Sequence, residues 1–355
     1  MKHLRIPAVL LLVLSLLFPA AAEEAATNLY EVPVYANVFL DPGSTPVITE
    51  NSYVSENIAI HITALRYEVP VAAYTQKCDV FIADIRVKDV HSFCRAFPGA
   101  QWGKQKQKLV PLSESAGAVL AMSGDSASDL YGGWLVFNGE MIRDGKKTPK
   151  YHRDLGILYE NGEFVTLDGK DFKTKENKEA LRASFDRGEI WQLFYFGPRL
   201  LDDEGHAMKK FNSDVNPANP RSVIGYYEPG HYCFVQVDGR STKSKLERGK
   251  VNRGLTLQNL SVLMEKLGCK AAYNLDGGKT SQMYYDGQVI STPQNGGRKL
   301  GDIVLIREPV PAEEPAEQPA EESAEQPTEQ PAEQSAEQPA EQSAEQPGAE
   351  PAGSQ

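Results

Sequence analysis

The sequence predicts an α+β fold: mixed, mostly antiparallel sheets with a few covering helices, in a single domain. Three observations support this fold class. Short apolar runs of strand length recur along the chain between residues that favour turns. Several of these turns are Asn-Gly or Asp-Gly, which are typical of tight hairpins between antiparallel strands. Apolar residues at helical spacing occur in only a few segments, so we expect few helices.

The first 22 residues are typical of a secretory signal peptide. Basic residues Lys2 and Arg5 precede an apolar run from Ala8 to Phe18, and small residues follow up to Ala22. The run is too short to span a bilayer comfortably, and the small residues favour cleavage over retention as an anchor. We therefore expect a secreted, extracellular protein, cleaved near Ala22 and without a membrane span afterwards.

The C-terminal segment, residues 309–355, repeats Ala-Glu-Gln-Pro and Ala-Glu-Gln-Ser, and it is predicted to be a disordered tail. It contains 12 Glu and no Lys or Arg, whereas the whole chain has a formal net charge of −11. Residues 1–308 alone therefore carry a charge of about +1. The acidity belongs to the tail. Because no basic stripe with interleaved aromatic residues appears, a nucleic-acid partner is not expected.

A lead segment, residues 23–54, is expected to precede the folded domain, residues 55–308. Extended runs at Ile58–Leu65 and Asp79–Val87 predict strands in the first part of this domain. The first run suggests no chemistry. In the second, Asp84 and Arg86 lie two residues apart and so share one face of an extended strand; a solvated salt bridge at an edge is favoured, and a pair that points into a pocket is the alternative.

A short helix is predicted over Ser113–Gly117, with Ser113 as its N-cap. The small apolar run Ala118–Met122 then predicts a strand that ends at Gly124 and Asp125. Two hairpins follow, with turns at residues 138–139 and 161–162.

The aromatic-rich run Ile190–Phe196 is expected to be a core strand, and a polar loop follows over residues 202–220. This loop contains residue types that bind metals, including Asp203 and His206, but it lacks the spacing that would hold them on one element. A mobile surface loop is the favoured interpretation, and a lid over a site is the second. No metal and no cofactor are expected.

The next hairpin is predicted over residues 221–237, and its second strand ends in Asp238 and Gly239. A helix capped by Thr256 follows, because apolar residues recur on one of its faces before Gly268. Hairpin 282–291 and a final strand over Asp302–Ile306 complete the domain.

Four cysteines, Cys78, Cys94, Cys233 and Cys269, permit two disulfides in an exported chain, with buried free thiols as the alternative. If bridges form, we expect Cys78 to pair with Cys94 and Cys233 with Cys269.

The central stretch of the sequence is the strand-like run Cys269–Leu275, which stops at Asp276, Gly277 and Gly278. The glycines let the backbone turn tightly and approach a ligand closely. By itself, an Asp-Gly-Gly segment is better interpreted as an ordinary turn. The sequence on both sides of this segment instead favours a functional site.

Residues 221–307 resemble the phosphodiester glycosidase domain, the family of the mannose-6-phosphate uncovering enzyme and its bacterial exported relatives. The resemblance rests on RSVIGYY, VQVDGRS, GLTLQNLSVLMEKLGCKAAYNLDGG, SQMYYDGQVIS and Arg298, in that order. VFIADIRV and AVLAMSGD extend it to roughly residues 55–307. It implies hydrolysis of a sugar-1-phosphodiester at the anomeric carbon, which yields free sugar and a phosphomonoester.

Two departures from the family pattern bear on specificity. The family commonly has a third glycine and two serines where this chain has Lys279, Thr280 and Ser281, and it often has Asn where Ser123 stands. Lys279 places a long cation beside the expected site. This indicates an anionic ligand or a substrate different from that of the best-known family member.

Such chemistry needs carboxylates for the anomeric centre and cations or N–H donors for the phosphate. Asp276 is the first candidate for base or nucleophile, and Asp125 and Asp238 are the alternatives. The candidate substrate-binding residues are Gly124, Arg221, Arg240, Asn274, Gly277, Gly278, Lys279, Thr280, Ser281 and Arg298. The competing interpretations are strand-start ion pairs or exposed loops for the arginines and plain turns for Asp238 and Asn274.

The expected partner is a carbohydrate or sugar-phosphate substrate, with contact to cell-surface glycans. Two other functions compete with the glycosidase. One is a non-catalytic carbohydrate- or wall-binding module on the same fold, and the other is a phosphodiesterase that cleaves P–O bonds. The presence of Asp and Arg at the family's motif positions favours the glycosidase.

Overall fold

A computed structural model describes residues 38–71, 74–125, 133–145, 153–211, 213, 215–240, 245 and 251–309. All of them belong to one unit of the chain, Met1–Val310, which is separate from Pro311–Gln355. The predicted signal peptide and, apart from Pro309, the predicted tail lie outside the described residues.

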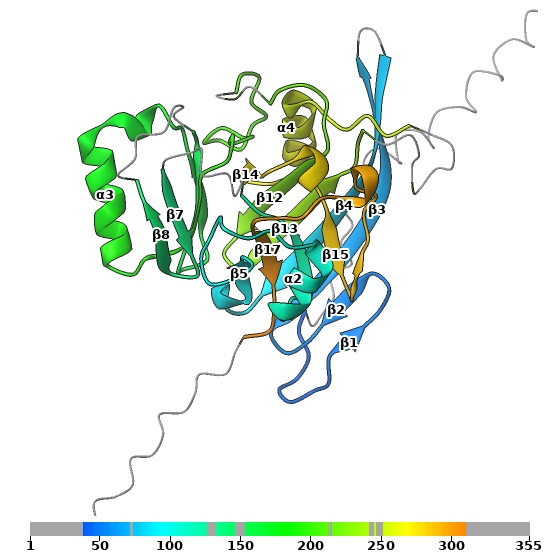
Figure 1. Ribbon diagram of the computed structural model, residues 1–355, viewed down its shortest axis with the longest axis horizontal. Helices are drawn as coiled ribbons and strands as arrows, with labels where there is room; N and C mark the ends of the chain where they lie inside the picture. Colours follow the sequence, from blue (N-terminus) through cyan, green and yellow to red (C-terminus); the bar gives the residue numbers. More distant parts are fainter. Residues whose placement is uncertain are drawn as a thin grey trace, which may run out of the picture. The chain divides into compact units, whose positions relative to one another are not determined.

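The largest sheet joins strands between residues 47 and 87 to strands between residues 221 and 274 (Figure 1). Its strands, in spatial order, are β1 (Val47–Ile48), β2 (Ser52–Val54), β3 (Ile58–Val71), β4 (Tyr74–Val87), β13 (His231–Val237), β12 (Arg221–Glu228) and β14 (Ala271–Asn274). Strands β1 and β2 fall within the predicted lead segment. The pairing of β4 with β13 brings the N-terminal hairpin beside the hairpin predicted over residues 221–237.

Two five-stranded sheets complete the strand arrangement. One contains β10 (Phe164–Leu167), β9 (Leu155–Tyr159), β11 (Ile190–Phe194), β7 (Trp134–Phe137) and β8 (Glu140–Asp144). The other contains β16 (Gln288–Val289), β15 (Met283–Tyr285), β6 (Leu120–Ser123), β17 (Ile303–Ile306) and β5 (Phe93–Ala96). Every strand pair in the described part of the chain is antiparallel, which confirms the predicted sheet type.

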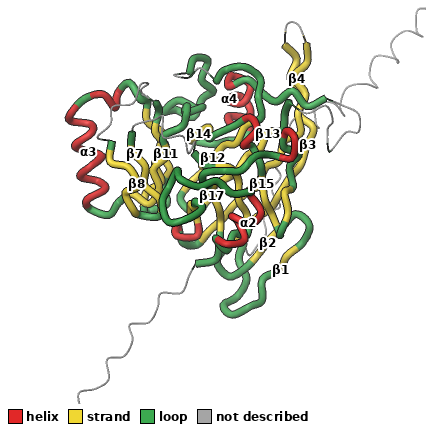
Figure 2. The backbone as a smooth tube through the Cα atoms, in the orientation of Figure 1, coloured by secondary structure: helices red, strands yellow, loops and turns green. Residues whose placement is uncertain are grey.

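The described part of the chain forms far fewer helices than strands (Figure 2). The described helices are α2 (Leu109–Ser115), α3 (Lys175–Asp186) and α4 (Leu257–Lys266), with short 3-10 turns η1 (Val90–Ser92), η2 (Asp171–Lys173), η3 (Gly278–Thr280) and η4 (Gln294–Gly296). The hydroxyl of Thr256 accepts from the N–H of Asn259, as predicted for the cap of α4. The prediction of a helix starting at Ser113 was wrong, because α2 begins at Leu109. Pro111 lies in its first turn, where a missing N–H costs nothing.

The central strands of the seven-stranded sheet are buried on both faces. Along β13, Phe234 packs in a cluster with Met122 of β6 and Val304 of β17, whereas the next residue, Val235, packs in the cluster that contains Leu260 of α4. Alternate residues of a strand point to opposite faces, so β13 contributes side chains to the hydrophobic cores on both faces of the sheet. This layering holds β6, β14 and β17 in fixed relative positions, and the candidate site lies where these strands end or begin.

All four cysteines are buried free thiols. The predicted Cys78–Cys94 bridge is wrong, because Cys78 packs in the cluster next to α4 while Cys94 packs in a different cluster, with Leu109 and Leu305. The sulfur atoms of Cys233 and Cys269 lie 3.9 Å apart.

Candidate active site

Three chain segments meet at the ends of β6, β14 and the start of β17. The N–H of Asp276 donates to the carbonyl of Gly124 at 3.1 Å, and the N–H of Gly124 donates to the carbonyl of Asp302 at 3.2 Å. The Gly-Asp turn after β6 and the Asp-Gly-Gly turn after β14 are therefore neighbours.

Asp276 is held in place by its own turn. Its Oδ1 accepts from the N–H of Gly277 at 2.9 Å, and its Oδ2 lies 3.7 Å from Nη2 of Arg298. Only 19% of its side chain is exposed. Burial raises the pKa of this carboxyl above its ordinary value, and the nearby Arg298 charge opposes that shift. The result is a partly desolvated carboxylate with a cation at its free oxygen.

A cavity of about 410 Å³, called the large cavity below, opens beside Asp276. Its lining residues are Phe196, Val215, Asn219, Arg221, Arg240, Leu275, Asp276, Gly277, Gly278, Lys279 and Arg298. Four of these described residues are cations and one is a carboxylate. The structure therefore brings together Asp276 and all four predicted cations at one hollow, which is a composition suited to an anionic ligand.

A second hollow of about 40 Å³, called the small cavity, shares Asp276 and Arg298 with the large one. Its other lining residues are Lys106, Ser123, Gly124, Asp125, Thr280, Lys299, Leu300, Gly301 and Asp302. A space of this volume has room for water molecules at the carboxylate.

The side chain of Arg221 connects backbone segments in the wall of the large cavity. Its guanidinium donates to the carbonyls of Val215 at 2.7 Å, Pro217 at 2.6 Å and Leu255 at 3.1 Å, and the residue is 2% exposed. Burial lowers its pKa to about 10, and the charge of Arg240 adds to the effect. Because these donors are already used, Arg221 is less available to a ligand than the three exposed cations of the cavity, and a phosphate-binding role for any of the four stays a prediction.

Arg240, Lys279 and Arg298 are exposed at their side chains. Arg240 donates through Nε to Oδ1 of Asn219 at 2.8 Å. Its Nη1 would lie 3.4 Å from a Cβ at Gly278, whose φ of +69° also favours glycine. Gly278 therefore lets this guanidinium approach the turn.

The backbone amides of Gly277 and Gly278 are already used, contrary to their predicted role as phosphate donors. The first donates to the Asp276 carboxylate, and the second donates to the carbonyl of Pro220 at 3.1 Å. These two glycines contribute to the site through the tight backbone conformation that they allow. Side-chain cations are left to bind an anion.

Asp125, an alternative catalytic candidate, has both oxygens engaged. They accept from the N–H groups of Tyr195 at 2.7 Å and Phe196 at 2.9 Å, and Arg95 lies 3.6 Å away. Asp125 therefore fixes the end of β11, which carries Phe196 to the large cavity. It also lines the small cavity.

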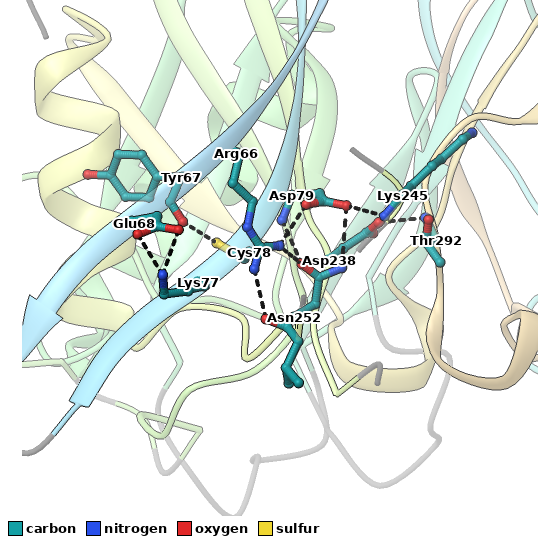
Figure 3. A network of polar contacts seen from close by, with 11 residues as sticks. Arg66, Tyr67, Glu68, Lys77, Cys78, Asp79, Asp238, Lys245, Asn252 and Thr292 are labelled. Carbon is teal, nitrogen blue, oxygen red and sulfur yellow. Dashed lines mark hydrogen bonds and ion pairs between the residues drawn. The ribbon is translucent and has the colours of Figure 1, made fainter. Parts of the chain in front are cut away.

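Asp238, the other alternative, lines neither cavity and belongs to a separate polar network (Figure 3). Its Oδ2 accepts from the N–H of Thr292 at 2.5 Å, and its own N–H donates to the carbonyl of Asp79 at 2.9 Å. Asp79 in turn accepts from Arg66 at 2.8 Å and from the N–H of Lys245 at 2.7 Å. This network anchors the strand end that precedes Arg240.

The burial of Asp238 predicts a pH-dependent stability. Burial raises its pKa from 3.8 to about 7, so the folded protein retains a proton that the unfolded chain releases near pH 4. The stability from this proton is complete below pH 4 and is lost as pH rises to about 7. Relative to Asp238→Asn, the free energy of unfolding of the wild type should decrease over this range by on the order of 4 kcal/mol. Urea titrations at several pH values measure it, and a pH-independent difference would contradict the assignment.

Asn274, Thr280 and Ser281 are buried, and the first two donate hydrogen bonds to nearby backbone carbonyls. Nδ2 of Asn274 donates to the carbonyl of Gly197 at 2.9 Å, and the hydroxyl of Thr280 donates to the carbonyl of Gly277 at 2.6 Å. Of the three, Thr280 lines the small cavity. Asn274 and Thr280 therefore hold the backbone around Asp276, and the side chains of all three residues lie outside the large cavity.

Asp302 and Arg95 were missed by the sequence reasoning. Oδ2 of Asp302 accepts from Nη2 of Arg95 at 2.6 Å and from the N–H of Asp125 at 3.1 Å. Burial raises the pKa of Asp302 to about 7, and Arg95 opposes the shift. A Cβ at Gly124 would lie 2.6 Å from this carboxylate, which explains the glycine. In the sequence Asp302 stands only as the first residue of a strand, so no local signal marks it.

The polar loop predicted over residues 202–220 contributes Val215 and Asn219 to the large cavity. No group of metal-ligating side chains that could hold an ion is found among the described residues.

None of the described helices has the length and apolar character needed to cross a membrane.

Residues 116–307 match the family model of phosphodiester glycosidases. A stretch of 119 residues is 31% identical to the SPbeta prophage-derived uncharacterized protein YomE of Bacillus subtilis strain 168, covering 33% of this chain and 17% of that protein. The fold is similar to the catalytic domain of zebrafish N-acetylglucosamine-1-phosphodiester alpha-N-acetylglucosaminidase, auto-inhibited by its pro-peptide, with a TM-score of 0.53 and 17% identity over 70% of this chain and 84% of the other.

Proposed function

Because this chain belongs to the phosphodiester glycosidase family, a family of hydrolases, we propose that it hydrolyses a sugar-1-phosphodiester at the anomeric carbon. The products are the free sugar and a phosphomonoester. The observation that carries the proposal is the large cavity, where Asp276 lies among the cations Arg240, Lys279 and Arg298.

We assign complementary tasks to Asp276 and Arg298. Their side chains lie 3.7 Å apart, which supports their acting on neighbouring atoms of one substrate. Asp276 acts on the anomeric centre, either as nucleophile or as the base for water. In both routes the C1–O bond breaks, water supplies the new hydroxyl of the sugar, and the phosphate leaves with the bonding electrons. Arg298 stabilises the negative charge that develops on it.

We place this activity outside the cell, on surface or extracellular glycans. The support is the N-terminal sequence, whose basic start, apolar run and small residues up to Ala22 are typical of export. The cation-lined large cavity is compatible with glycans whose units are joined through phosphate.

The test is a panel of sugar-1-phosphodiesters incubated with the protein in ¹⁸O-labelled water. We expect release of free sugar with the label in the sugar hydroxyl. Label in the phosphate would instead show P–O cleavage and would exclude the glycosidase. Absence of product with every member, while the protein binds them, would support a non-catalytic binding module.

A further inference from the structure

The large cavity holds more positive charge than one phosphodiester balances. Its described lining contains four cations and the single carboxylate of Asp276. A phosphodiester carries one negative charge, which one guanidinium satisfies with two parallel hydrogen bonds. Even without Arg221, whose guanidinium already donates to backbone carbonyls, positive charge remains after a phosphodiester has bound.

Three exposed cations surround the η3 turn. The N–H of Arg298 donates to the carbonyl of Lys279 at 3.2 Å, so the two residues are neighbours across adjacent segments. On the other side, Arg240 approaches Gly278, the residue before Lys279. Lys279 forms no ion pair with any residue in the described part of the chain, whereas Arg298 faces Asp276 and Arg240 is held by Asn219.

Gathering like charges is unfavourable unless an anion occupies the space between them. Burial is the main cause that lowers the pKa of Arg221, and the nearby charge of Arg240 lowers it further. A fold that keeps such a cluster at a cavity gains most from a ligand with more than one negative charge.

Resting on the proposed function, we infer that the substrate carries a second oxyanion group beside the hydrolysed phosphodiester and that Lys279 is the specificity residue that contacts it. Arg298 lies at the reacting carboxylate and takes the phosphate that leaves. Lys279 is one residue beyond the Gly277–Gly278 pair, on an exposed and flexible side chain. An ammonium group on four methylenes suits an anion whose position varies, for example along a phosphate- or carboxylate-bearing glycan.

The experiment compares two synthetic substrates that share the sugar and the 1-phosphodiester. One has a glycerol aglycone, and the other has the same glycerol bearing a terminal phosphate. For the wild type we expect kcat/KM to be about 5- to 20-fold higher with the phosphorylated aglycone. Lys279→Met should reduce that ratio to about 1–2, while Lys279→Arg should restore it.

The matched control is Lys270→Met, which removes an exposed lysine away from both cavities and should keep the wild-type ratio. Circular dichroism checks that each variant is folded. A wild type that hydrolyses both substrates equally well, or a Lys279→Met variant that keeps the preference, overturns the inference and leaves the glycosidase proposal standing. Release of sugar from neither substrate nor from the panel overturns both.

Discussion

Replacing Asp276 with Asn is expected to lower kcat by about 10²- to 10⁴-fold without unfolding the protein. Asn keeps the size of the side chain and an oxygen that accepts from the N–H of Gly277, so the turn after β14 is preserved. What is lost is the negative charge beside Arg298, and with it both the nucleophile and the base. KM should change far less, because the cations proposed to hold the phosphate remain.

Sugar release from the best substrate of the panel measures this effect, and circular dichroism with thermal unfolding checks the fold. Asp286→Asn is the matched control. Asp286 lies exposed in the β15–β16 turn with φ of +46°, a conformation that Asn tolerates, so this variant should retain wild-type kcat. Wild-type turnover by a folded Asp276→Asn protein would remove Asp276 from the reaction.

Replacing Asp302 with Ala is expected to lower the free energy of unfolding by about 3 to 5 kcal/mol. The side chains of Asp302 and Arg95 are both 0% exposed, and their ion pair measures 2.6 Å. Without Asp302, the guanidinium of Arg95 keeps its bond to the carbonyl of Leu193 and the longer contact with Asp125, but it loses its closest anion. The stability is lost because the buried charge of Arg95 is left without a close carboxylate.

Urea unfolding at constant pH measures the loss. The double variant Arg95→Met with Asp302→Leu is the control, because it removes both charges and fills the volume with apolar atoms next to Phe137 and Phe194. It should recover at least half of the lost stability. If Asp302→Ala alone costs less than about 1 kcal/mol, the pair is not a structural requirement.

The strands and hairpins were predictable because their signals are local. The hairpin of β12 and β13 follows from two apolar runs separated by a turn that contains Pro229 and Gly230, and α4 follows from its Thr256 cap and one apolar face. The start of α2 was misplaced, because Ser113 is a favourable N-cap residue in the sequence, whereas the actual N-cap, Lys108, makes no side-chain cap hydrogen bond that would mark it.

The candidate site was predictable only in part. Asp276 stands out because an abrupt carboxylate and two glycines end a strand, and Gly124 was placed near it on similar grounds. The same reasoning placed Asp238 there, and the structure instead puts this residue in the network with Asp79 and Thr292. Strand ends look alike in sequence, and whether two of them lie at the same place depends on the order of strands in the sheets.

By itself, the sequence determined the sheet type, the positions of the hairpins, the family resemblance and the identity of the turn that carries Asp276. Periodicity, capping residues and turn pairs act over a few neighbouring residues, so one chain suffices to detect them. Only the tertiary structure decided that Arg240 and Arg298 share a cavity with Asp276, that Asp125 is engaged by backbone N–H groups, and that Asp302 lies buried against Arg95. These relations join residues up to 207 positions apart, and burial and packing alone fix which distant charges meet.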